Sequence, residues 1–381
     1  MTEQKSKRII SIDLLRGIVV ALMALDHVRF FFHASAAEFS PTNLEKASAM
    51  LFFTRWITHF CAPLFLLLAG VSAALMVNKK GIKSTTYFLW TRGLFLIILE
   101  LLVFRFGWNI TAFNHWEAHQ MLVISMIGIC MIILAGLIYL PPKVILGIGL
   151  FIVLLHNLLQ NVQISPESSF YNLWVLAYKG GGMAPMGIFR VFVLFAFLPY
   201  LGIISCGYGI GQLYTNNYTP EARKKILLIA GSACIVLFII LRTFNIYGDP
   251  SHWSPQKNTL YSFLSFINTT KYPTSLLYTL MTIGPGLICL ALTENVRGRV
   301  NQFFVVLGSV PMFYYILHLF LIQLSSLLLT VIIFNEFGIQ KFNLTTVYIV
   351  WILVILILYP ICAAYRKYKF AHPEKIWLSY I

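Results

Sequence analysis

Ten long apolar segments, joined by mostly short polar connections, constrain the fold of this chain more than any other feature. A helix needs about 20 predominantly apolar residues to cross a bilayer. With 59% hydrophobic and 11% charged residues, the 381-residue chain is too apolar for a soluble fold. We predict an all-α, polytopic membrane helix bundle, one domain over residues 1–381. Its ten transmembrane helices are expected at 9–33, 51–78, 86–106, 120–140, 143–160, 188–213, 226–245, 273–293, 310–334 and 345–365.

The distribution of Lys and Arg predicts how the bundle is oriented. With the N-terminus inside, the inner connections and termini carry sixteen of these residues and the outer ones carry ten. The positive-inside rule then puts both termini in the cytoplasm and the protein in the cell (inner) membrane, surrounded by lipids. Because the charges are spread over short connections with no basic tail, the net charge of +15 predicts no nucleic-acid partner.

The first apolar segment is unusual because ionisable residues interrupt it. Such groups are costly at membrane depth and normally face a protein interior or a water-filled cavity. Residues 11 or 14 positions apart return to nearly the same helix face, so Asp13, Arg16 and His27 form one stripe. Asp26 and His33 form a second stripe. The pattern predicts a helix that lines a polar path or site, with Asp13 paired to Arg16.

Three connections on the predicted outer side are long: 34–50, 161–187 and 246–272. Long ordered loops in a compact protein are usually functional, so this face is where a large substrate would be held. Trp108 falls on the same side. Both an aromatic belt at the membrane interface and stacking on a sugar would explain it.

The opening of the chain carries a dense set of motifs. They are RIISIDLLRG at 8–17, DH at 26–27, HAS at 33–35, HFCAPLF at 59–65 and AGVS at 69–72. Together they resemble the first two spans of the heparan-alpha-glucosaminide N-acetyltransferase family. Weaker matches at 247–250, 265–273 and 310–318 are nearer to its bacterial branch. The resemblance is dense over residues 8–76 and patchy beyond them.

This resemblance implies a transmembrane acyltransferase with its active-site core in residues 8–120. Enzymes of the family move an acetyl group from cytoplasmic acetyl-CoA to an amine or hydroxyl beyond the membrane, here on an amino sugar or another glycan. The HAS motif implies that His33 is the base or acyl carrier. Asp26 would orient an imidazole. His27, which stands where the family has an asparagine, would hold the oxyanion or share the proton.

Cations near the predicted inner end are candidates for binding the CoA phosphates: Arg16, Arg92, Lys79 and Lys80. The positive-inside rule explains the lysines equally well, whereas Arg92 lies inside an apolar run and needs a partner there. His59 has a structural alternative, because Pro63 frees a backbone carbonyl about one turn earlier. Candidates for acceptor contacts gather toward the predicted outer side: His59, Trp108, His119, Gln120, Arg242 and Lys271.

Two further ionisable residues lie inside later spans. Glu100, about two turns beyond Arg92, would be neutralised by protonation or by a cation. For His318, the expected role is that of a hydrogen-bonded histidine in helix packing.

A second hypothesis is a proton-coupled transporter or channel that uses Asp13, Asp26, Glu100 and the histidines. The lack of internal repeats and the clustering of histidines at one end favour the enzyme. No metal is predicted, because the histidines and carboxylates lack HExxH or EF-hand spacing. The sequence leaves open whether the chain forms a homodimer and whether another acyl group replaces acetyl.

Overall fold

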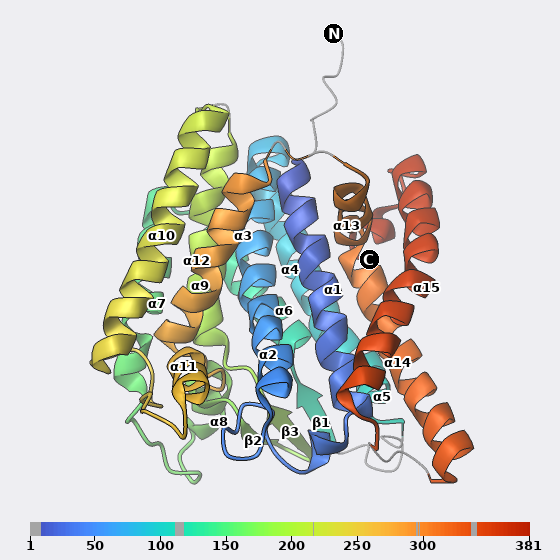
Figure 1. Cartoon of the computed structure of the whole chain (residues 1–381). Coiled ribbons are helices and arrows are strands. Elements are labelled where there is room, and N and C mark those ends of the chain that lie inside the picture. The colour runs from blue at the N-terminus through green and yellow to red at the C-terminus, as the bar shows by residue number, and fades with distance from the viewer. Residues whose placement is uncertain (1–8, 111–117, 216, 295, 297, 337–340) are drawn as a thin grey trace.

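The computed structural model describes residues 9–110, 118–215, 217–294, 296, 298–336 and 341–381; Arg8, the first residue of the opening motif, lies outside these ranges. The described chain is mainly helical, and its long helices run roughly side by side (Figure 1). A helix lies in each predicted span. They are α1 (Ile10–Phe32), α3 (Cys61–Lys80), α4 (Ile82–Leu99), α6 (Val123–Leu137), α7 (Pro142–Leu155), α9 (Phe197–Gly211), α10 (Pro220–Phe244), α12 (Leu276–Leu292), α14 (Pro311–Phe334) and α15 (Leu344–Ala371).

The described chain also contains five shorter α-helices and, among its short helical turns, one that continues α4. They are α2 (Ala49–Ile57), α5 (Arg105–Trp108), α8 (Tyr171–Trp174), α11 (Thr259–Ile267), α13 (Arg299–Ser309) and the π-helical turn η3 (Glu100–Phe104).

Length and composition identify six stretches of the described chain as helices able to cross a membrane: Ala49–Lys80, Ile82–Trp108, Pro142–Leu159, Pro220–Phe244, Pro311–Phe334 and Leu344–Ala371. Helices α6 and α12 are apolar but shorter. Helix α1 has 23 residues and carries Asp13, Arg16, Asp26 and Arg29. The peripheral helices expose apolar side chains, such as Ile239 on α10. This is an integral, multi-pass membrane protein.

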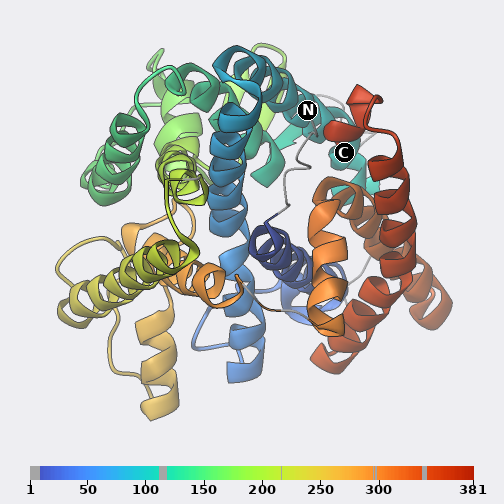
Figure 2. The ribbon, with the colours of Figure 1, turned by 90° about the horizontal axis from the view of Figure 1, so that it is seen from above.

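Helix α1 lies in the interior of the bundle, where Figure 2 shows it in dark blue among the other helices. It packs against α3, α13, α14 and α15. Glycines allow the closest of these approaches: a Cβ on Gly17 would lie 1.8 Å from the carbonyl oxygen of Phe304, and one on Gly308 would lie 1.9 Å from that of Asp13. Small residues let membrane helices approach closely. The polar residues of α1 are therefore enclosed by protein.

The prediction of an all-α fold, with a span over 188–213, is wrong in one region. Strands β1 (Ala118–Met121), β2 (Gly182–Met186) and β3 (Phe189–Val193) form a sheet of order β1-β3-β2. It lies at the end of the bundle where α1 finishes (Figure 1), and α9 begins only at Phe197. The β3 sequence, FRVFV, is rich in β-branched and aromatic residues, which favour strands. A short apolar run alone does not distinguish a strand from a helix.

Glu100 caps a neighbouring helix. Its carboxylate accepts hydrogen bonds from the backbone N–H groups of Leu122 (2.8 Å), Ile124 (3.2 Å) and Ser125 (2.7 Å) at the start of α6. Helix α6 has no side-chain cap from its own N-terminal residue. Because backbone amides at a helix start need acceptors and attract negative charge, Glu100 has a structural role that requires no cation partner.

Candidate functional site

Three adjoining cavities follow α1 from its first residues toward its last. The Lys79 cavity has a volume of about 700 Å³ and is lined by residues that include Asp13, Arg16, Lys79 and Lys80. The Arg16 cavity, about 320 Å³, shares Arg16, Ser72 and Met76 with it and also contains Arg92, Tyr315 and Lys369.

The third cavity, which we call the His27 cavity, has a volume of about 340 Å³. It shares Met23, Phe65 and Val123 with the Arg16 cavity, so the two meet beside the middle of α1. Arg16, Met23 and His27 line these spaces from one stripe of α1, as the helical spacing predicts. The expected Asp13–Arg16 ion pair is confirmed at 3.2 Å.

His27 forms a hydrogen-bonded pair with His318 on α14. The Nδ1 atom of His318 lies 2.9 Å from the carbonyl oxygen of Tyr314, so this nitrogen carries the donated proton. In a neutral imidazole the Nε2 atom of His318 is then an acceptor, and Nδ1 of His27 donates to it over 2.8 Å. His27 Nε2 keeps its lone pair and has no hydrogen-bond partner among the described residues. The pair presents a basic nitrogen.

Two aromatic side chains enclose the His27 imidazole. The Trp108 ring meets it edge-on with centroids 4.8 Å apart, and the Tyr315 ring lies at 6.0 Å. Trp108 lines the His27 cavity and Tyr315 lines the Arg16 cavity. Within the described part of the chain, the buried Trp108 Nε1–H and Tyr315 hydroxyl have no hydrogen-bond partner. The junction of the two cavities therefore combines one base with two unused donors.

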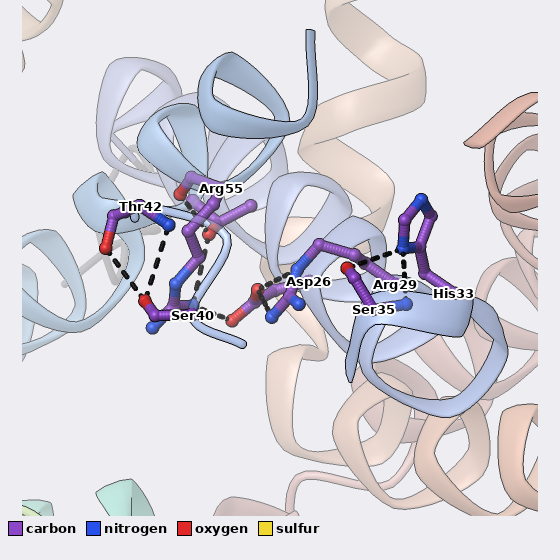
Figure 3. A network of polar contacts seen from close by, with 8 residues as sticks. Asp26, Arg29, His33, Ser35, Ser40, Thr42 and Arg55 are labelled. Atoms are coloured by element: carbon purple, nitrogen blue, oxygen red, sulfur yellow. Dashed lines mark hydrogen bonds and ion pairs between the residues drawn. The ribbon is translucent and has the colours of Figure 1, made fainter. Parts of the chain in front are cut away.

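Asp26 lies between two guanidinium groups, as Figure 3 shows. Its Oδ1 atom is 3.0 Å from Arg29 Nη2, and its Oδ2 atom pairs with Arg55. The predicted role of Asp26 in orienting an imidazole is not supported, because both of its oxygens are engaged by arginines. Asp26 instead fixes two cations in the wall of the His27 cavity.

His33 follows the last residue of α1 and bonds locally. Its Nδ1 atom lies 2.8 Å from Ser35 Oγ and accepts the Ser35 N–H at 3.2 Å (Figure 3). Burial, and then the nearby Arg29 charge, lower the pKa of His33 from its ordinary 6.5. Among the described residues, those that line the His27 and Arg16 cavities do not include His33.

The predicted CoA-binding cations lie along the first two cavities. Arg16 Nη2 donates to Ser72 Oγ at 2.9 Å. Arg92 Nη1 donates to the backbone carbonyl of Ser379 at 3.2 Å, so the C-terminal residues supply the partner that Arg92 was expected to need. Lys79 and Lys80 are exposed at the rim of the Lys79 cavity.

The predicted acceptor contacts divide into two groups. Trp108, Gln120 and Lys271 line the His27 cavity. His59 is buried, 2% exposed, and packs against the Tyr278 ring. His119 lies on β1, and its Nδ1 atom is 3.4 Å from Nη1 of Arg105. In the described structure, His59 and His119 are outside the lining of the His27 cavity.

Arg242 is a structural residue, contrary to the prediction that it contacts the acceptor. Its side chain is only 1% exposed. It donates to four backbone carbonyls of the 246–272 connection, those of Ser251 (2.6 Å), Phe266 (2.9 Å), Ser265 (2.9 Å) and Asn268 (2.7 Å). With its donors used in this way, the guanidinium holds the loop rather than a ligand.

Sequence reasoning missed the positions of Arg55, Tyr315 and His318 beside the cavities. The sequence indicates for Arg55 no more than one of the ten cations on the predicted outer side, and for His318 a role in helix packing. No local pattern connects His318 to His27, which lies 291 residues earlier. The sequence feature that these three residues share is that each is polar or ionisable and lies within or at the end of an apolar run.

A family model describes the first two-thirds of the chain. Residues 8–247 match the model for "Heparan-alpha-glucosaminide N-acetyltransferase, catalytic". The match includes α1 and the cations of the Lys79 and Arg16 cavities up to Arg92, whereas Lys271 and His318 lie beyond it. No curated protein matches the chain.

Proposed function

Because the chain belongs to the heparan-alpha-glucosaminide N-acetyltransferase catalytic family, we propose that it transfers acetyl groups from cytoplasmic acetyl-CoA to a glycan beyond the membrane. The acceptor would be an amino sugar or another sugar with a free hydroxyl. The observation that carries this proposal is the His27–His318 pair, in which His27 lines the cavity that adjoins the Arg16 cavity.

The donor fits the first two cavities by its chemistry. The CoA phosphates are anionic, and Lys79, Lys80 and Arg16 provide cations along the Lys79 cavity. The Arg16 cavity continues toward Met23 and Phe65 between mainly apolar walls, which suits the neutral arm that carries the thioester. We place this end of the bundle at the cytoplasm, in agreement with the excess of Lys and Arg in the inner connections.

His27 would act as the base. Its Nε2 lone pair accepts the proton of the acceptor amine or hydroxyl as that group attacks the thioester carbonyl. The carbonyl carbon forms a bond to the acceptor, the carbon–sulfur bond breaks, and CoA leaves as a thiolate that takes up a proton. The Trp108 N–H and the Tyr315 hydroxyl are available to stabilise the oxyanion. His318 holds His27 in the required tautomer.

The transporter alternative finds less support. A carboxylate that relays protons or binds a cation needs an accessible oxygen. Asp26 is paired with two arginines, Glu100 accepts three backbone N–H groups, and Asp13 pairs with Arg16.

The test is acetyl transfer by the purified full-length protein from labelled acetyl-CoA to a panel of amino sugars. We expect transfer by the wild type, none above background by H27A, and transfer near wild type by H33A. H252A, at an exposed loop histidine, is the matched control. Loss of transfer in a folded H33A together with activity in H27A would return the catalytic role to His33, as the HAS motif implies. No transfer to any acceptor by folded wild type would refute the proposed function.

A further inference from the structure

The His27 cavity contains more positive than negative charge. Its lining includes one carboxylate, that of Asp26, and three cations, Arg29, Arg55 and Lys271. The two arginines share Asp26 between them. One carboxylate cannot neutralise three cations, so the described wall of the cavity carries an excess of positive charge.

Lys271 is the cation that Asp26 does not pair with. Within the described residues, its ammonium has no ion pair or hydrogen bond to a carboxylate. The Nζ atom instead lies 5.7 Å from the centre of the Phe195 ring and 5.4 Å from that of the Tyr272 ring, and both rings line the same cavity. An aromatic ring attracts a cation but does not neutralise its charge.

The surroundings make this excess charge costly without a ligand. Most of the cavity lining is apolar, including Phe30, Phe192 and Leu194. Cations removed from water need a counter-charge, and an arginine fork matches the oxygens of a carboxylate or phosphate. Burial, and then the nearby Arg55 charge, lower the pKa of the Lys271 ammonium, and the opposing effect of Asp26 does not offset them.

We propose that the His27 cavity binds an acceptor that carries an anionic group, held by Lys271 together with Arg29 and Arg55. This proposal rests on the proposed function for the identity of the ligand as acceptor. The reacting amine or hydroxyl faces His27, and the carboxylate or phosphate of the same molecule lies against the cations. Asp26 has the role of keeping both guanidinium groups in place. A sugar acid and a sugar phosphate offer the same chemistry, and the test separates them.

The experiment measures binding and transfer separately, using the full-length protein in detergent. The probes are glucosamine, muramic acid and glucosamine 6-phosphate, which share a free amine and differ in the anionic group. Calorimetry without acetyl-CoA measures binding, and labelled acetyl-CoA measures transfer. We expect at least one anionic probe to bind about tenfold or more tightly than glucosamine. If the anionic group of the acceptor is a carboxylate, muramic acid should be the tighter ligand. If it is a phosphate, glucosamine 6-phosphate should be the tighter ligand.

Variants of Lys271 test whether this residue causes the preference for an anionic probe. K271Q should lose the preference for the anionic probe, K271R should keep most of it, and K257Q, at an exposed lysine of the same loop, should be unchanged. Thermal unfolding of each variant checks that it folds; if K271Q does not, K271M takes its place.

Two outcomes would overturn the proposal: equal binding of glucosamine and both anionic probes by the wild type, or an unchanged preference in a folded Lys271 variant. Efficient transfer without an anionic preference would reject this subsite and leave the acetyltransferase assignment intact. An anionic preference in binding without any transfer would support this subsite and reject the acetyltransferase assignment.

Discussion

The imidazole of His27 lies 2.8 Å from the imidazole of His318, a residue of α14 that lies 291 positions later in the chain. The Tyr314 carbonyl sets the tautomer of His318, and His318 sets that of His27 and leaves the lone pair on His27 Nε2. Catalysis by His27 is therefore expected to depend on a residue that need not touch substrate.

Replacement of His318 tests this dependence. Because His318 positions the base and does not replace it, H318A should lower kcat by about 10- to 100-fold with little change in the KM for acetyl-CoA. H27A should cost more, about 100-fold to 10,000-fold in kcat, as expected for a general base. The pH profile of kcat should shift in H318Q, since glutamine cannot share the proton in the same way. An unchanged pH profile in H318Q together with an unchanged rate in H318A would remove His318 from the mechanism.

Arg92 is expected to contribute to donor binding. It lines the Arg16 cavity, and its guanidinium is held by the Ser379 carbonyl. We expect R92Q to weaken CoA affinity by about tenfold through loss of a charge-assisted contact. The measurement is the CoA-induced rise in Tm. K83Q, at an exposed lysine of the same helix, is the control and should respond to CoA like the wild type. An equal response in R92Q would contradict the assignment.

Arg242 is expected to matter for stability rather than for donor binding. R242A would leave four loop carbonyls without a donor and should destabilise the fold by about 2–4 kcal/mol. Thermal unfolding should show a lower Tm, while CoA affinity of the folded fraction stays unchanged. R190A, on the exposed face of β3, should unfold like the wild type. A wild-type Tm for R242A would show that the carbonyls find other partners.

Glu100 is expected to stabilise the start of α6. E100A would leave three backbone N–H groups without an acceptor away from water, with a cost of about 2–4 kcal/mol. E100Q keeps one carbonyl oxygen and should cost less. Thermal unfolding of the two variants, with E38A at an exposed glutamate as the control, gives the comparison. Equal Tm values for E100A and E100Q would argue against the capping role.

His33 should make stability depend on pH. Its pKa in the folded protein is lowered from 6.5 by burial and by Arg29, so the unfolded chain takes up this proton more readily. The contribution of His33 is therefore complete above its unfolded pKa and is lost as pH falls from about 6.5 toward the lower folded value. Between pH 7 and about pH 5, the Tm of H33Q should fall less than that of the wild type. The Tm of H252Q should depend on pH as that of the wild type does. The same pH dependence of Tm in H33Q as in the wild type would contradict the lowered pKa of His33.

Much of the architecture could be predicted from local sequence. The lengths of the apolar runs predict where the helices lie, and a helix lies in every predicted span. Helical spacing puts Arg16, Met23 and His27 on one stripe, and spacing of three residues pairs Asp13 with Arg16. The region 188–213 was misread because strand β3 owes its conformation to pairing with β1 and β2, and hydrophobicity does not record that pairing.

The roles of individual site residues could be predicted less well. The motif that drew attention to His33 did not reveal that its ring bonds to Ser35, and Arg242 looked like a ligand residue until its carbonyl partners were known. Spacing of three residues on α1 is compatible with the Asp26–Arg29 pair, but nothing in the sequence indicated that Arg55 would also pair with Asp26. Arg55 reaches Asp26 only because α2 folds back beside the end of α1.

By itself, the sequence determined a membrane protein whose first apolar helix carries ionisable residues on one stripe, because bilayer thickness and the helical repeat act on consecutive residues. The tertiary structure alone decided that His27 would meet His318, and that Arg55 would join Arg29 at the carboxylate of Asp26. The physical reason is that these contacts join helices distant in sequence, and their geometry depends on how the helices pack.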